Sequence, residues 1–488
     1  MHKCITVCLS GTLSVFILSG CTSPFDTPVQ SPFDTSRLIM PDGASLSDSI
    51  YRRDELASTT EREEQTPLAP PSLDGSVGDF VSYALFHSPE VERAYQQWRQ
   101  AVERLPQVRA LPDPRLTLGF YLNEVETRVG PQQARMGISQ TFPWVGKLRD
   151  REDAAAKGAL AAWYQYQDAQ LRVSERVLIA LYNLAFLDST IKITQENYDL
   201  LISFEEVVRA RYRVGAGSHP ELIRVQVELG QLDDRVEGLR VLRPSYVASL
   251  NAVLNRDPEI HIDTITDLPG WVASGDAKEV SEMAQEFSPV LQSVNSRIEQ
   301  ARIETEVARK DGYPNITVGV DYVLTDQARN PSTPESGDDP LMLSFGMNLP
   351  IWREKYDAGV RASIARRLSI SREFEAKENT LASQVYQSWF EHTDADRRVR
   401  LYERSLIPKA QESLSASLAG FRTGDSEFLD LLDTERTLLE FSIAGERARA
   451  ERGKALATLN RLVGHPVPVK NDNQSQSETD INSEEVQP

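Results

Sequence analysis

Two aspartates near the C-terminal end of the chain have the spacing that most clearly suggests chemistry. Asp430 and Asp433 are three positions apart, so their carboxylates share one face if the segment is helical. They follow the turn Thr423-Gly424-Asp425 closely in the sequence. Carboxylates gathered in this way attract cations, and rings of them regulate pores. The alternative is that both belong to the solvated face of an acidic helix.

Other reactive residue types lack the spacing of an active site. The histidines beyond the N-terminal segment are scattered, with no i,i+4 pair and no cysteine partner, so no metal cluster is expected. Gly215 and Gly217 lack the preceding strand and the third glycine of a dinucleotide-binding loop. The sequence therefore predicts a protein that is not an enzyme and that needs neither a cofactor nor a metal.

The N-terminus predicts export. Lys3 is followed by a short apolar run that ends in Leu18-Ser19-Gly20-Cys21, which is too short for a spanning helix and is typical of a secretory signal. The last four residues resemble a bacterial lipoprotein cleavage box, which predicts a signal peptide over 1–20 and a lipid on Cys21. Thr22 after the cysteine favours the outer membrane by the same analogy. The alternative is an ordinary signal with an unmodified cysteine.

Cysteine usage and charge exclude two further classes. Cys4 and Cys8 lie in the expected signal peptide, so no disulfide framework remains in the mature chain. The formal net charge is −19, which excludes a typical nucleic-acid binder. Residues 21–76, rich in Pro, Ser and Thr, predict an extended tether, and the polar residues 467–488 predict a disordered tail.

The elements that must position the aspartates are repeated along the chain. Ser88-Pro89 opens a helical stretch that ends before Pro112-Asp113-Pro114, and Ser288-Pro289 opens one that ends before Pro314. Further paired markers keep the same order: Phe142-Pro143-Trp144 with Leu349-Pro350-Ile351-Trp352, Arg213-Val214-Gly215 with Arg422-Thr423-Gly424, and Leu254-Asn255-Arg256 with Leu459-Asn460-Arg461. A repeat of this length indicates a duplicated half rather than a short solenoid unit. We place the halves at 78–262 and 276–466.

Each half contains two segments in which apolar residues alternate with more polar ones, as in strands. The first pair turns back over 124–131, and the second over the longer stretch 325–340. Tilted strands of about nine to eleven residues are long enough to cross a bilayer. Because open strand edges are not tolerated in lipid, four spanning strands need other copies of the chain to close a barrel. The alternative is a pair of hairpins packed on the helices of a protein that does not enter the membrane.

Very long helices follow the strands. The helical pattern runs over 144–212 in the first half and over 352–421 in the second, where Pro408 predicts a kink. Helices of this length indicate coiled-coil packing. Each ends at a glycine turn, after which a shorter antiparallel helix returns.

Taken together, these motifs resemble the TolC-type outer membrane efflux family. The resemblance rests on Leu111-Pro112-Asp113-Pro114, on Gln140-Thr141-Phe142-Pro143-Trp144-Val145-Gly146-Lys147, on the duplicated plan and on the two tight turns. It implies a mainly α fold with membrane β-strands, in which a homotrimer forms a twelve-stranded barrel in the outer membrane and a helical tunnel across the periplasm. It also implies a periplasmic adaptor protein and an inner-membrane RND transporter as partners. The Pro-Asp-Pro and Phe-Pro-Trp-x-Gly-Lys motifs are similar to those of the branch that serves heavy-metal pumps.

The resemblance also assigns site residues. Asp430 and Asp433 match the acidic rings at the periplasmic gate of the family. The two turns match its adaptor-docking tips, with the following residues: Tyr212, Arg213, Gly215, Gly217, Phe421, Arg422 and Gly424. For the glycines, plain turn formation is the simpler explanation. Two other functions stay open at this point: a duct for type I protein secretion, and a lipid-anchored coiled-coil scaffold without a pore.

Overall fold

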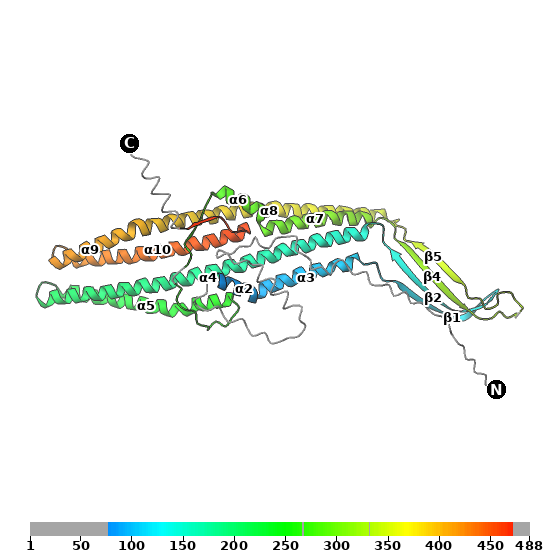
Figure 1. Ribbon diagram of the computed structural model, residues 1–488, viewed down its shortest axis with the longest axis horizontal. Helices are drawn as coiled ribbons and strands as arrows, with labels where there is room; N and C mark the ends of the chain where they lie inside the picture. Colours follow the sequence, from blue (N-terminus) through cyan, green and yellow to red (C-terminus); the bar gives the residue numbers. More distant parts are fainter. Residues whose placement is uncertain (1–76, 266–267, 331, 472–488) are drawn as a thin grey trace, which may run out of the picture.

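The computed structural model describes residues 77–265, 268–330 and 332–471. The chain forms a long rod with a β-sheet at one end and the turns of two helical hairpins at the other (Figure 1). The expected signal peptide, Cys21, the tether up to residue 76 and the tail from residue 472 lie outside the described residues.

The described elements follow the same order in both halves. The first half contains α2 (Val77–His87), α3 (Pro89–Arg109), β1 (Arg115–Thr127), β2 (Gly130–Phe142), α4 (Lys147–Arg213) and α5 (His219–Val253). The second contains β3 (Trp271–Ala273), α6 (Ala277–Phe287), α7 (Pro289–Lys310), β4 (Ile316–Thr325), β5 (Leu341–Met347), α8 (Arg353–Leu401), the π-helical turn η2 (Tyr402–Leu406), α9 (Ile407–Thr423), α10 (Phe428–Val463) and β6 (Val469–Asn471).

The four long strands form one antiparallel sheet in the order β1-β2-β4-β5. Residues that face each other across antiparallel strands lie on the same face of the sheet. One such row runs across all four strands and is apolar and exposed along its whole length: Leu116, Ile138, Val320 and Leu343. The opposite face carries polar contacts, including Arg135 Nε with Asp321 Oδ1 at 3.1 Å and Thr141 Oγ1 with Thr317 Oγ1 at 3.0 Å. Hairpins that packed their apolar face on the helices would show the reverse pattern.

The connection predicted over 124–131 in the first half is wrong. β1 continues to Thr127 and β2 begins at Gly130, so the turn is tight. The longer second connection holds this extension in place. Backbone hydrogen bonds join Asp326 N–H to Pro131 O (2.8 Å) and Gly337 N–H to Val129 O (2.7 Å). Long-range pairing therefore extends strands that the local sequence alone would end.

The junction between β2 and α4 explains the Phe-Pro-Trp-x-Gly-Lys motif. Gly146 precedes the helix in a left-handed conformation, with φ of +77°, which glycine adopts without strain. The buried Lys147 extends its ammonium to Asp311 Oδ1 at 2.6 Å, at the end of α7. The Trp144 ring stacks on Tyr313 with centroids 5.1 Å apart. The motif thus fastens the first half to the second where strands become helices.

The long helices agree with the predicted lengths. α4 has 67 residues without interruption, which at 1.5 Å per residue corresponds to about 100 Å. The second long helix is broken where a kink was predicted: α8 gives way to the π-helical turn η2, and α9 begins just before Pro408. The N–H of Ile407 bonds to Tyr402 O, five residues back, so the wide turn absorbs the break at the proline.

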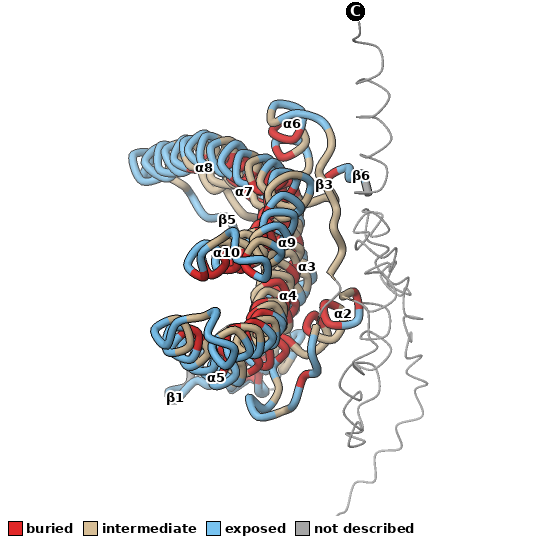
Figure 2. The backbone as a smooth tube through the Cα atoms, turned by 90° about the vertical axis from the view of Figure 1, so that its left-hand side faces the viewer, coloured by how far each residue is buried: buried red, intermediate tan, exposed pale blue. Residues whose placement is uncertain are grey.

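Packing is divided along the rod. α4 lies centrally and packs against α3, α5, α7 and α10, and the helices form a curved arrangement that is open on one side (Figure 2). One core cluster joins α2, α3, α4 and α5, a second lies under the hairpin turns, and a third joins α6, α8 and α10. The buried Trp163 and Tyr166 belong to the first cluster. The hairpin turns therefore have a core of their own.

The prediction of a disordered tail from residue 467 is wrong for residues 467–471, which are ordered parts of the fold. Val467 is buried, and its N–H donates to Asn460 Oδ1 at 2.8 Å. β6 then pairs with β3, which lies at the start of the second half. This small sheet was missed because each strand has three residues and too little local pattern for prediction.

Candidate functional site at the helical tips

The two hairpin turns lie next to each other at the end of the rod that is farthest from the sheet (Figure 1). We call residues 211–218 the first tip and residues 420–427 the second tip. In the first tip, Gly215 has φ of +76°, a conformation that favours glycine. The Arg211 carbonyl accepts the N–H groups of Ala216 (2.9 Å) and Gly217 (3.2 Å). α5 then begins with the Ser218 N–H donating to the Glu221 carboxylate at 3.1 Å.

The second tip repeats this plan. Gly424 has φ of +89°, and the Gly420 carbonyl accepts the N–H groups of Gly424 (2.9 Å) and Asp425 (2.8 Å). At the start of α10 the Glu427 N–H donates to the Asp430 carboxylate at 3.3 Å. Asp430 thus occupies the capping position that Glu221 occupies in the first tip. The duplication therefore extends to the hydrogen bonding of both turns.

One side chain ties the two tips together. Arg211 Nη1 donates to the Phe421 carbonyl, and Nη2 donates to Ala216 O at 3.2 Å. The guanidinium carbon also lies 4.5 Å from the centroid of the Phe421 ring, which is the geometry of a cation–π contact. A charged donor shared by both turns stabilises the arrangement in which they are held together.

Phe421 lies beneath this contact as the apolar anchor of both tips. Its side chain is 2% exposed, and its ring centroid is 5.6 Å from that of Phe428. The surrounding cluster draws on both hairpins and includes Phe204, Val225 and Leu431. The structure therefore corrects the prediction that Phe421 faces an adaptor: its ring holds the tips to each other and is not available to a partner.

The remaining predicted docking residues are on the surface. Tyr212 is 45% exposed, and Arg213 and Arg422 are also exposed. The glycines form the turns described above, and this accounts for Gly215, Gly217 and Gly424 without any partner.

Asp430 and Asp433 both lie in the first turns of α10 and are exposed. Asp430 has a structural task as well, because it caps the helix. The hydrogen bond and charge of Glu228, followed by the charges of Glu435 and lastly Asp433, raise the pKa of Arg436. The two aspartates therefore share one end of the rod with the tips and are available to solvent and ions.

A second link joins the hairpins below the tips. Arg436 of α10 donates from Nε to Glu228 Oε1 of α5 at 3.0 Å, and its Nη2 also donates to Glu228 Oε2. Two hydrogen bonds between one guanidinium and one carboxylate fix the relative orientation of the two groups as well as the distance between them. The side-chain bond to Glu228 is the largest cause of the raised Arg436 pKa.

The sequence missed both links for a physical reason. Arg211 and Arg436 each contact a residue of the other hairpin more than two hundred positions away, with separations of 210 and 208. The spacing of residues within one helix gives no information about a partner that is so far away in the sequence. The one available signal is indirect: Arg211 and Arg213 both end α4, where cations favour a helix C-terminus.

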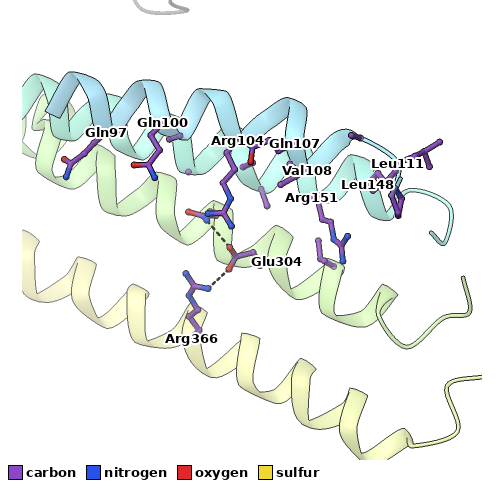
Figure 3. A pocket seen from close by; sticks show the side chains of 18 of the residues that line it. Gln97, Gln100, Arg104, Gln107, Val108, Leu111, Leu148, Arg151, Glu304 and Arg366 are labelled. Atoms are coloured by element: carbon purple, nitrogen blue, oxygen red, sulfur yellow. Dashed lines mark hydrogen bonds and ion pairs between the residues drawn. The ribbon is translucent and has the colours of Figure 1, made fainter. Parts of the chain in front are cut away.

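No group of three or more His, Cys, Asp or Glu within residues 77–265, 268–330 and 332–471 is arranged to hold a metal ion. A polar groove does lie near the sheet, between α3, α4, α7 and α8 (Figure 3). Its volume is about 1070 Å³, and Arg104, Arg151 and Glu304 are among its lining residues. Arg366 Nη1 contacts Glu304 Oε2 at 2.9 Å across it. The lining of this groove therefore combines charged and amide side chains with apolar ones.

Comparison with known proteins places these features in a family. The family model described as outer membrane efflux protein matches the chain twice, over residues 80–256 and 280–465. The cobalt-zinc-cadmium resistance protein CzcC of Cupriavidus metallidurans is 19% identical over 364 residues, which cover 73% of this chain and 82% of CzcC. The outer membrane protein TolC of Vibrio cholerae is 22% identical over 410 residues, covering 80% and 90%.

The fold is shared with solved channels. The outer-membrane channel OprN superposes with a TM-score of 0.66 at 16% identity, over 80% of this chain and 90% of OprN. Helical hairpins and a strand region are thus arranged in this chain as they are in a known channel.

Proposed function

Because this chain belongs to the outer membrane efflux protein family, of the TolC type, we propose that three copies form an exit duct. The strands β1, β2, β4 and β5 of each copy would contribute to one twelve-stranded barrel in the outer membrane. The helices would continue this barrel as a tunnel across the periplasm. Substrates would pass through it passively, driven by the pump to which it is attached.

The observation that carries the proposal is the sheet. One face of the sheet carries an exposed apolar row from all four strands, and the other face carries polar contacts; a barrel with a lipid-facing exterior and a wet interior requires two such faces. Within the described chain, β1 pairs only with β2 and β5 only with β4. The outer edges of β1 and β5 are therefore open to strands of neighbouring copies. In lipid, a closed barrel is the arrangement that gives the backbone groups of these edges hydrogen-bond partners.

The tips supply the periplasmic gate of this duct. In a trimer, Asp430 and Asp433 would each form a ring of three carboxylates around the axis. Such rings attract cations and narrow a pore electrostatically. The links of Arg211 and Arg436 would hold each chain's hairpins together, which favours a closed aperture.

The exposed tip residues Tyr212, Arg213 and Arg422 would face a periplasmic adaptor protein, which in turn contacts an inner-membrane RND transporter. We propose metal cations as the cargo. The support is the sequence similarity to CzcC, whose name records cobalt, zinc and cadmium resistance, together with the acidic residues at the gate.

We also propose that Cys21 carries lipid, which would attach the N-terminus to the outer membrane in addition to the barrel. One acyl chain gives only marginal binding, so the anchor would assist a membrane attachment that the strands provide. Mass spectrometry of the mature chain tests this: an unmodified Cys21, or cleavage elsewhere, contradicts it.

Purified protein in planar lipid bilayers tests the duct. We expect discrete single-channel currents from a trimer, identified by its mass in detergent. A trimer that inserts and gives no current would support a scaffold without a pore. For the cargo, deletion of the gene should lower resistance to divalent metal ions. Loss of protein secretion with unchanged metal resistance would instead indicate a secretion duct.

A further inference from the structure

A buried carboxylate lies between the two hairpins, directly behind the exposed aspartates. Glu435 is 1% exposed, and neither oxygen of its side chain has a hydrogen-bond partner of good geometry; the nearby amide of Asn197 is the weakest influence on its pKa. It occupies the inward-facing side of α10, where the other buried positions at helical spacing are apolar: Phe428, Leu431, Leu432, Leu439 and Ile443. A leucine would fit the pattern at this position, so the acidic residue is the exception in an otherwise apolar stripe.

The groups around Glu435 come from three helices. α5 contributes the carboxylate of Glu228, and α4 contributes the amide of Asn197, whose Oδ1 is also buried without a partner. On α10 itself the neighbouring cation is Arg436, which is already bound at two points to Glu228. No α9 group is among those that shift the pKa of Glu435. The site thus holds a second negative charge and a cation that is already engaged.

A charged carboxylate is costly in this position, because an apolar, packed environment replaces the water that would stabilise the charge. Burial first, and then the charge of Glu228, raise the pKa of Glu435 to about 7, against the smaller opposing effects of Arg436 and Asn197. Since packing raises this pKa above its value of 4.5 in water, the packed arrangement is most favoured at pH below 4.5. It loses this advantage as the pH rises through about 7.

We propose that Glu435 is a proton-operated latch on the tips. With the carboxyl protonated, α10 packs against α4 and α5 and the tips remain together. When the proton leaves, the unpaired charge beside Glu228 drives α10 away from the other hairpin and favours an open periplasmic end. The opening of a periplasmic gate rests on the proposed duct function. The pH-dependent movement of the hairpins does not, because it depends only on contacts within the chain.

The first experiment measures that movement directly. Spin labels are placed on the full-length trimer in detergent through Arg213→Cys on the first tip and Thr423→Cys on the second, with Cys4, Cys8 and Cys21 replaced by serine so that no other thiol remains whether or not the N-terminal segment is removed. We expect the label–label distance distribution to shift to longer distances between pH 6 and pH 8. Glu435→Gln keeps the size of the side chain without its charge, and should hold the short distances at both pH values.

Glu440→Gln is the matched control, since Glu440 lies on the same helix and is exposed. It should behave as the wild type does. Distances that do not change with pH in the wild type, or that change equally in Glu435→Gln, would overturn the latch.

The second experiment measures the consequence in planar bilayers. Open probability of the wild type should rise at least threefold when the pH on the tip side is raised from 6 to 8, with a midpoint near 7, whereas Glu435→Gln should stay at the lower level. A wild-type pH response that survives in Glu435→Gln contradicts the latch. If the spin-label distances respond as expected but no preparation conducts, the latch stands and the proposed duct fails.

Discussion

The two tips are built on one plan and do different things. Both end a long helix with a left-handed glycine, Gly215 or Gly424, and both cap the returning helix with an acid at its third position. The first tip then supplies the cation, Arg211, while the second supplies the carbonyl and ring of Phe421 that receive it. Only the second tip is followed by the pair of aspartates Asp430 and Asp433. Duplication thus provides the scaffold, and the differences between the copies provide the contacts between them.

Residues at corresponding positions of the tips should therefore respond differently to the same substitution. The largest difference is expected between Phe421, which is buried, and Tyr212, its counterpart in the first tip, which is 45% exposed. Phe421→Ala should lower the stability of the tips by about 3–5 kcal/mol, because a large buried ring is lost. Tyr212→Ala should cost about 1 kcal/mol or less. Hydrogen exchange at residues 204–218 and 414–432 measures both, and equal losses in the two variants would contradict the assignment of Phe421 as the anchor.

Next in size is the loss of the bridge between the tips. Arg211→Ala removes charged hydrogen bonds worth about 1.5–3 kcal/mol each and should raise the open probability of single channels about tenfold or more, since each 1.4 kcal/mol corresponds to a factor of ten. Arg422→Ala removes an exposed arginine from the other tip and serves as the control. If both variants conduct as the wild type does, the bridge does not hold the gate.

A smaller effect is expected from the carboxylates. Asp430→Ala with Asp433→Ala should raise ion conductance or weaken its block by divalent cations, about tenfold for a loss of 1.4 kcal/mol in cation binding. Glu221→Ala, which removes the corresponding helix cap from the first tip, separates this effect from the loss of a cap. Block that is unchanged in the double variant would remove the aspartates from the gate.

The smallest effect concerns docking. Arg213→Glu with Arg422→Glu reverses two exposed charges, and exposed charges at the rim of an interface change affinity by about 1 kcal/mol or less each. Assembly with the adaptor should weaken several-fold and depend more strongly on salt. Lysine at both positions keeps the charge and is the matched control. Assembly that tolerates the reversal would place the adaptor contact elsewhere.

The sequence predicted most of this scaffold because its signals are local. Prolines and glycines end the helices, alternation marks the strands, and α4 contains no proline that would interrupt it. It did not predict the contact of Arg211 with Phe421, the pairing of β3 with β6, or the tight turn between β1 and β2, since each depends on a partner that is far away in the sequence. Glu435 was not predicted either, although the sequence does carry a signal for it. It is a single acidic residue that interrupts the apolar stripe of α10.

The central claim is that the duct narrows at the tips, and not at the sheet. The most direct measurement is single-channel conductance of the oriented trimer with a nonelectrolyte polymer added to one side at a time. We expect a polymer small enough for the barrel to lower the conductance when it is added on the strand side and to have little effect on the tip side. Equal effects from both sides, or exclusion on the strand side, would contradict a gate at Asp430 and Asp433.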